Sequence, residues 1–117
     1  MNGEQIYYHA KLYLGIQCVH EGYSPNKGFN SAGFVYYVHN DAGFECPRHI
    51  GNIIIGGDPG TGAVGDVICW RNQVGICDGT GNVIQAYKKS VGIYNIEEVN
   101  NELGKYIGFR RYYNKSI

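Results

Sequence analysis

The spacing of apolar residues changes near Asp66, and this change restricts the fold more than any other feature of the sequence. Beyond this point the chain carries short apolar runs at residues 66–70, 74–77, 83–87, 91–96 and 106–113. The connections 71–73 and 78–82 are short and rich in turn-forming residues, so they predict tight hairpins between strands. Sequential hairpins form a meander, and we therefore expect one antiparallel sheet, with a short helix over residues 97–103 before the last strand.

The first half of the chain has helical spacing instead. Residues 3–14 and 31–41 carry apolar side chains three and four positions apart, and each run stops at a glycine-containing segment. Residues 16–25 are expected to be a loop or a short extended piece, residues 53–55 fit a helix or a strand, and residues 56–65 are expected to be a glycine-rich loop. The sequence of 117 residues thus predicts a single α+β domain in which N-terminal helices pack on a sheet.

Composition excludes several classes of partner. Ten basic and ten acidic residues balance, so no overall field favours nucleic acid or an anionic membrane surface. The locally basic segment 105–115 is interpreted as a solvated edge strand rather than a binding patch. No apolar run approaches the ~20 residues of a membrane span, and the start of the chain lacks a signal-peptide pattern. We expect no nucleic-acid partner and no insertion into a membrane.

The cysteines and glycines do not predict a cofactor or metal site. Four cysteines show neither a CxxC pair nor zinc-ribbon spacing, and Cys69 and Cys77 lie in apolar runs typical of buried thiols. The glycine-rich segment 56–62 lacks the Lys-Ser/Thr of a phosphate-binding loop. Cys46, Arg48 and His49 form a polar cluster that we interpret as a loop packed against the sheet.

Residues 28–34 have the form of a helix start that carries a reactive side chain. Asn30 is a strong N-cap residue, and it places Ser31 in the first helical turn. Free backbone N–H groups there favour negative charge, which would activate a cysteine. A serine hydroxyl keeps its proton near neutral pH unless a base removes it. The chemistry available to this helix start therefore depends on a nearby base.

Taken in order, these segments resemble the NlpC-type cell-wall peptidases, a papain-like family, over about residues 4–112. Members carry Gly-Phe-Asp-Cys-Ser-Gly-Phe at a helix start, Gly-Asp before a strand, His-Val-Gly-Ile on the next strand, and a third polar residue on the strand after that. Residues 28–34, 65–66, 73–76 and 83–86 match these motifs in the same order. The resemblance implies a papain-like fold with a five- or six-stranded antiparallel sheet, and a cell-wall, extracellular or phage-associated setting.

The positions that carry the family's chemistry differ in this chain. The resemblance assigns Ser31 to the nucleophile position, Gln73 to the base position and Gln85 to the orienting position, and Cys18 to a position where a tyrosine is common. An amide cannot act as a base at neutral pH, and Asp66 is expected to stabilise the turn before its strand. We therefore expect an inactive relative that binds a peptide, such as a peptidoglycan stem peptide, or serves as a structural or regulatory module among other protein components.

Two alternatives keep the chain as a peptidoglycan hydrolase. A displaced pair of Cys18 and His20 could act near the same cleft, or Ser31 could itself be the nucleophile, although Cys18 as a packed apolar group is the interpretation we prefer. Ser31 could also be a mutation introduced into a natural cysteine enzyme. Gln73 and Gln85 argue against the second alternative, because a trapping mutation needs only the nucleophile to change.

Overall fold

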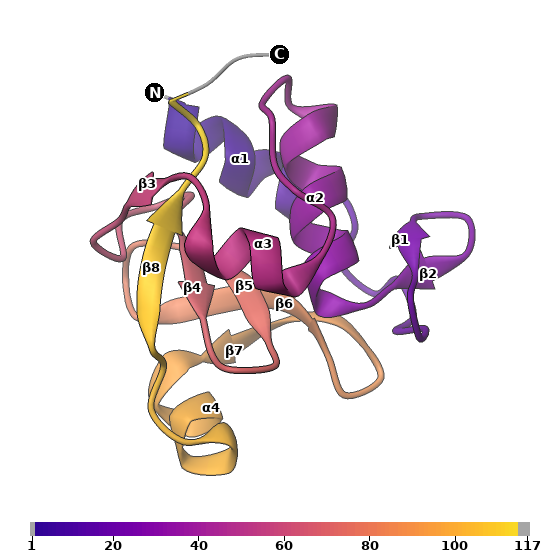
Figure 1. The fold of residues 1–117 in the computed structure, drawn as a ribbon. Helices are drawn as coiled ribbons and strands as arrows, with labels where there is room; N and C mark the ends of the chain where they lie inside the picture. Colours follow the sequence, from indigo (N-terminus) through magenta and orange to yellow (C-terminus); the bar gives the residue numbers. More distant parts are fainter. Residues whose placement is uncertain (1, 115–117) are drawn as a thin grey trace.

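The computed structural model describes residues 2–114, which form helices and strands in the order that Figure 1 shows. The helices of this part of the chain are α1 (Asn2–Lys11), α2 (Ser31–Asp41), α3 (Ile50–Ile55) and α4 (Ile96–Leu103). The strands are β1 (Tyr23–Ser24), β2 (Gly28–Phe29), β3 (Asp58–Pro59), β4 (Val67–Cys69), β5 (Val74–Cys77), β6 (Asn82–Tyr87), β7 (Ser90–Asn95) and β8 (Gly108–Arg111). The predicted α+β class is confirmed.

The main sheet has six antiparallel strands within residues 2–114, in the order β3-β8-β4-β5-β6-β7. The predicted meander is confirmed for β4 to β7, whose neighbours are joined by hairpins. The interpretation of the 105–115 segment as an edge strand is wrong, because β8 pairs with β4 on one side and with β3 on the other (Figure 1). Lys115, at the end of that segment, lies outside the described residues.

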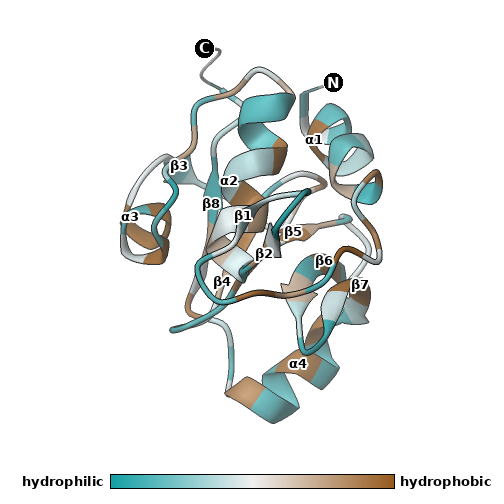
Figure 2. Cartoon of the chain, turned by 90° about the vertical axis from the view of Figure 1, so that its right-hand side faces the viewer, coloured by the Kyte–Doolittle hydropathy of each residue, from teal (hydrophilic) through white to brown (hydrophobic). Residues whose placement is uncertain are grey.

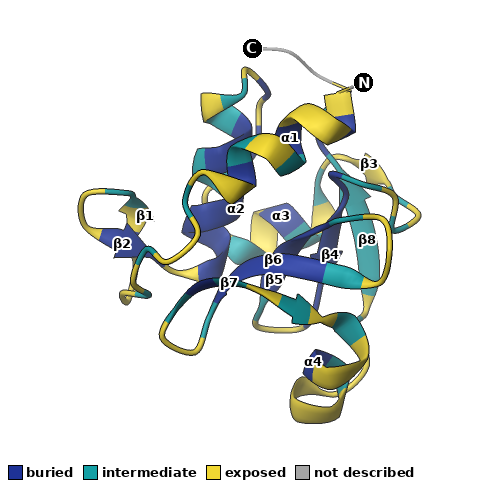
Figure 3. Ribbon diagram, turned by 180° about the vertical axis from the view of Figure 1, so that it is seen from behind, coloured by how far each residue is buried: buried dark blue, intermediate teal, exposed yellow. Residues whose placement is uncertain are grey.

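The two faces of the sheet are covered by different helices. On one face, Ile6 of α1, Phe34 of α2 and Ile53 of α3 share a buried cluster with inward-facing residues of β4, β5 and β6. On the other face, Val99 of α4 packs against a smaller cluster that includes Trp70. Figure 3 shows the buried residues concentrated in α2 and the central strands, and Figure 2 shows that the helices carry hydrophobic and hydrophilic residues on different sides. The expected packing of N-terminal helices on a sheet is confirmed.

Helix α2 has the bounds that the sequence predicts. Asn30 is its N-cap, and the Asn30 side-chain oxygen accepts a hydrogen bond from the Gly33 backbone N–H at 2.6 Å. Gly33 also has a packing role, since a Cβ at this position would stand 1.9 Å from the carbonyl oxygen of Gly22. The cap and this close approach together fix the start of α2 against the loop that precedes it.

Other parts of the N-terminal half differ from expectation. Helix α1 ends at Lys11 rather than at residue 14. Residues 53–55, which fitted either a helix or a strand, are the end of helix α3. Strands β1 and β2 form a two-residue ribbon around the turn that follows Tyr23–Ser24, and β3 lies inside the expected glycine-rich loop. Each of these strands is only two residues long, too short for an apolar pattern to reveal it.

Asp66 anchors the loop that precedes β4. Its buried carboxylate accepts hydrogen bonds from the backbone N–H groups of Thr61, Gly62 and Ala63, at 2.9–3.1 Å. Arg111 of β8 donates to both carboxylate oxygens, at 2.7 and 2.9 Å. Burial alone would raise the pKa of Asp66, but the hydrogen bonds and charge of Arg111 and the backbone donors outweigh it and lower the pKa. Asp66 therefore has the structural role expected from its place before a strand.

Candidate functional site

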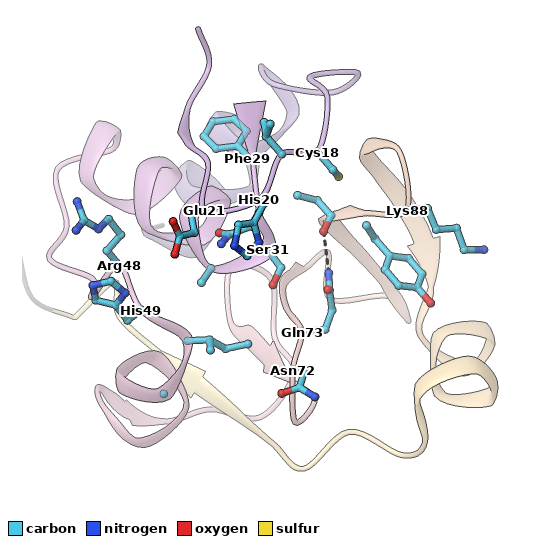
Figure 4. A pocket seen from close by; sticks show the side chains of 17 residues that line it. Cys18, His20, Glu21, Phe29, Ser31, Arg48, His49, Asn72, Gln73 and Lys88 are labelled. Atoms are coloured by element: carbon cyan, nitrogen blue, oxygen red, sulfur yellow. Dashed lines mark hydrogen bonds between the residues drawn. The ribbon is translucent and has the colours of Figure 1, made fainter. Parts of the chain in front are cut away.

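A cleft of about 530 Å³ lies at the N-terminal end of α2 (Figure 4). One side is formed by the segment around Cys18 and His20, and the other by the turn between β4 and β5 and by the end of β6. Arg48 and His49, just before α3, close one end. Four of the residues that the sequence singled out, Cys18, His20, Ser31 and Gln73, thus line one cleft.

Ser31 stands at the base of this cleft with little polar support. Its side chain is 8% exposed, and Oγ accepts a hydrogen bond from the Val74 backbone N–H at 3.3 Å. In the part of the chain that the structure describes, no histidine nitrogen forms a hydrogen bond with Ser31 Oγ or with Cys18 Sγ. The arrangement therefore holds a hydroxyl near the start of a helix with no base hydrogen-bonded to it among the described residues.

Gln73 uses its amide to link two strands. The Gln73 Nε2 donates a hydrogen bond to the Ala86 carbonyl oxygen at 2.9 Å, drawn as the dashed line in Figure 4. This contact joins the start of β5 to the end of β6 on the cleft wall. The Gln73 amide is a poor base, and its Nε2 is in addition bonded to the backbone of β6.

Gln85 is not among the residues that line the cleft. Its side chain is completely buried, and neither of its amide atoms has a hydrogen-bond partner within residues 2–114. A Cβ at Gly75 would stand 2.9 Å from the Gln85 Oε1, so the amide lies over the glycine of the neighbouring strand. The structure therefore brings Ser31 and Gln73 to the cleft and leaves Gln85 inside the protein.

Cys18 and His20 differ in accessibility and are not paired. Cys18 is half-buried, and this burial raises the pKa of its thiol, which favours the protonated form. Its backbone N–H donates to the Lys89 carbonyl oxygen at 2.8 Å, which fixes the segment beside the turn between β6 and β7. His20 is exposed on the rim. A thiolate–imidazolium pair needs a lowered thiol pKa and a hydrogen-bonded histidine, whereas the pKa of Cys18 is raised and no hydrogen bond joins Cys18 to His20 among the described residues.

The other histidines act elsewhere or lie at the end of the cleft. His9 contacts Asp41 at 3.1 Å. His39 is fully buried in α2, where its Nδ1 donates to the Val35 carbonyl oxygen at 2.8 Å, and burial lowers its pKa to about 4. His49 lines the cleft and is exposed. The predicted cluster with Cys46 is therefore divided, because Cys46 is buried in the core while Arg48 and His49 face the cleft.

Sequence reasoning missed the charged residues on the rims. Glu21 and Lys88 line the cleft, and they are the non-glycine residues of the described chain with positive φ, at 57° and 61°. Glu102 of α4 accepts hydrogen bonds from the Tyr87 hydroxyl and from Lys88 Nζ, the latter at 3.0 Å, and so fixes this wall. Strained backbone often accumulates at binding sites, but no pattern in the sequence indicates which polar residues adopt it.

Two further properties of the described residues concern metal ions and membranes. Residues 2–114 contain no group of three or more His, Cys, Asp or Glu side chains placed to hold a metal ion. Over the same residues, none of the helices combines the length and the apolar character needed to cross a membrane.

Comparison with known proteins identifies the fold. No family model matches the chain, and no curated protein matches its sequence. Among solved structures, an NlpC/P60 family protein from Bacillus cereus has a TM-score of 0.82 at 24% identity, covering 94% of this chain and 40% of that protein. The NlpC/p60 domain of the peptidoglycan hydrolase SagA has a TM-score of 0.75 at 26% identity, covering 84% of this chain and 92% of that domain.

A third solved structure, a Staphylococcus aureus protein described as similar to a lipoprotein of the NLP/P60 family, gives a TM-score of 0.80 at 21% identity. The match covers 94% of this chain and 41% of that protein, so the chain spans about two fifths of these longer structures. The resemblance to NlpC-type proteins and the papain-like fold with a six-stranded antiparallel sheet are confirmed.

Proposed function

We propose that this chain, which has the fold of the NlpC/P60 proteins, is a catalytically inactive relative whose cleft binds a peptide of the peptidoglycan stem type. The observation that carries the proposal is the environment of Ser31. Its hydroxyl lies at the cleft base beside an amide, Gln73, that is committed to the Ala86 carbonyl oxygen. Peptide hydrolysis at this position would need a base, and among residues 2–114 no histidine or carboxylate is hydrogen-bonded to this hydroxyl.

The magnitudes favour binding without turnover. A general base contributes typically 10²–10⁴-fold to the rate, and a nucleophile and its base act as one unit, so losing either removes most of their joint effect. At Ser31 the hydroxyl replaces a more nucleophilic thiol as well. The cleft itself retains a volume of about 530 Å³ with polar groups along both walls, which supports a role in binding.

The alternative, hydrolysis by Cys18 with His20, makes a prediction that separates it from the proposal. Cys18 is the one half-buried thiol among the four cysteines, since Cys46, Cys69 and Cys77 are buried. Because its pKa is raised, we expect Cys18 to react with iodoacetamide at pH 7 more slowly than free glutathione does, measured by mass spectrometry of the intact chain. Alkylation of Cys18 faster than glutathione would indicate a thiolate and favour the displaced pair.

Peptide binding is tested directly by titrating the isotope-labelled chain with a synthetic stem peptide, L-Ala-γ-D-Glu-L-Lys-D-Ala, and following amide chemical shifts by NMR. We expect shifts at cleft residues such as Ser31 and Gln73. Gly51 also lines the cleft, and a Cβ built there meets nothing within 4 Å, so Gly51→Trp is the variant chosen to place a bulky ring at the cleft. This variant should weaken binding about tenfold, or 1.4 kcal/mol.

Gly108→Trp is the matched control, because Gly108 lies outside the cleft and has equal space for a side chain. It should bind as the unmodified chain does. Absence of any shift on titration, or equal weakening by both tryptophan variants, would contradict peptide binding in the cleft.

The origin of Ser31 is tested by Ser31→Cys alone. If the chain is naturally inactive, this variant should leave muropeptides intact, because Gln73 still cannot act as the base. Appearance of cleavage in Ser31→Cys would contradict natural inactivity and support a mutated cysteine enzyme.

A further inference from the structure

A second depression, of about 440 Å³, lies on the far side of the turn between β4 and β5. Asn72 and Gln73 line both this depression and the cleft, so the two lie on either side of the same turn. The walls of the depression come from the turn on one side and from the segment between α4 and β8 on the other. A ligand that crosses Gln73 from the cleft would enter it.

The walls of this depression are held together by one side chain. Asn100 of α4 accepts a hydrogen bond from the indole Nε1 of Trp70 at 2.9 Å and another from the Tyr106 backbone N–H at 3.1 Å. The Ile107 backbone N–H donates to the Cys69 carbonyl oxygen at 2.7 Å. These contacts fix both walls before any ligand arrives, which lowers the entropy that binding would cost.

The lining of the depression combines cations with exposed apolar side chains. Arg71 and Lys105 are both exposed, no acidic residue lines the depression, and neither cation forms an ion pair within residues 2–114. Leu103 and Ile107 are 45% and 58% exposed beside them. Such a lining is complementary to a group that carries a carboxylate next to a small apolar side chain.

We propose that this depression is a subsite for the C-terminal end of the bound peptide. The terminal residue of a peptide that ends in alanine has an apolar methyl group and a free carboxylate on the same carbon, which matches this lining. Arg71 and Lys105 pair with the carboxylate, Leu103 and Ile107 contact the methyl group, and Gln73 lies beneath the peptide where it passes from the cleft. The assignment rests on the proposed function, since it extends the same peptide site.

The test compares two forms of the stem peptide, one with a free C-terminal carboxylate and one with a C-terminal amide, by isothermal titration calorimetry. Exposed ion pairs are worth about 0.2–1 kcal/mol each, so Arg71→Gln with Lys105→Gln should weaken the acid form about two- to thirtyfold. The amide form should change by less than about twofold. Lys27→Gln with Lys89→Gln removes the same charge from exposed positions outside both cavities and should leave both affinities unchanged.

The outcomes distinguish this subsite from the cleft. If Gly51→Trp weakens binding but the Arg71 and Lys105 substitutions do not, the subsite is wrong and the proposed function stands. Equal losses for the acid and amide forms, or for the control pair, would also overturn the subsite. If a short oligoglutamate binds as tightly as the stem peptide and loses the same affinity, the surface recognises acidic partners in general, and the assignment is wrong. If no peptide binds, both proposals fail.

Discussion

Asp66 and Ser31 are both buried polar side chains at the start of an element, yet the fold supports them very differently. Asp66 has three backbone donors and a two-pronged contact from Arg111, all supplied by the protein itself. Ser31 has one backbone donor at 3.3 Å and faces the cleft. A polar group whose partners all come from the fold stabilises it, whereas a group with few partners at a cleft can change with little loss of stability. Under the proposed function, this difference explains how the helix start can persist in an inactive relative.

The largest effect is expected at Asp66. Asp66→Asn should lower the free energy of unfolding by about 3–5 kcal/mol, because it leaves Arg111 without its charged partner in a partly buried site. Urea denaturation measures the change. Asp58→Asn, at an exposed position, should alter stability by less than about 0.5 kcal/mol. A loss below about 1 kcal/mol at Asp66 would break the contrast drawn with Ser31.

The next effect depends on pH and involves His39. The folded state keeps His39 neutral, with a pKa of about 4, whereas an unfolded chain takes up the proton near pH 6.5. The contribution of neutral His39 to the free energy of unfolding is therefore fully present above about pH 6.5. It is lost as the pH drops towards 4, by about 3 kcal/mol in total.

Thermal unfolding between pH 7 and pH 4 should show that stability falls with the pH, and His39→Phe should remove the part of this pH dependence that His39 causes. The exposed His20 provides the control, and His20→Gln should keep this pH dependence. An unchanged pH dependence in His39→Phe would show that other groups cause it.

Substitutions at Gln85 and Gln73 are expected to have smaller effects on stability, and the two effects are opposite in sign to each other. Replacing the unpaired Gln85 by leucine should stabilise the protein by about 1 kcal/mol, because a buried amide without partners gives way to apolar contacts. Gln73→Leu removes the hydrogen bond to the Ala86 carbonyl oxygen and should destabilise by about 1 kcal/mol. Both are measured by chemical denaturation. A clear loss of stability in Gln85→Leu would mean that the amide has a partner, such as a bound water.

The smallest stability effect is expected at Ser31 itself. Ser31→Ala should change the free energy of unfolding by less than about 1 kcal/mol, since the single hydrogen bond to Oγ is long. Thermal unfolding beside Asp66→Asn gives the comparison under the same conditions. A loss at Ser31 equal to that at Asp66 would remove the distinction between the two sites.

Helices and strands that are bounded by a cap residue or by turn-forming residues could be predicted from the sequence. The Asn30 cap and the Ala42-Gly43 stop gave the bounds of α2, and strand β5 followed from the turns on both sides of it. The position of β8 inside the sheet depends instead on pairing with β3, an exposed two-residue strand that contains a proline. Such long-range pairing leaves no trace in local spacing.

The candidate site was predictable only where motifs mark it. The resemblance led to Ser31, Gln73 and the segment around Cys18, and these residues do surround one cleft. Glu21 and Lys88 line the cleft with positive φ values, and no motif in the sequence marks these two non-glycine residues. The burial of Gln85 away from the cleft depends on how β6 packs, which a motif does not specify.

The most direct test of the central claim is whether the unmodified chain cleaves purified muropeptides, followed by mass spectrometry over many hours. We expect no product above the level of a protein-free control, and the same result for Ser31→Ala and Cys18→Ala. Cleavage by the unmodified chain that disappears in either variant would identify that residue as a working nucleophile and contradict the account.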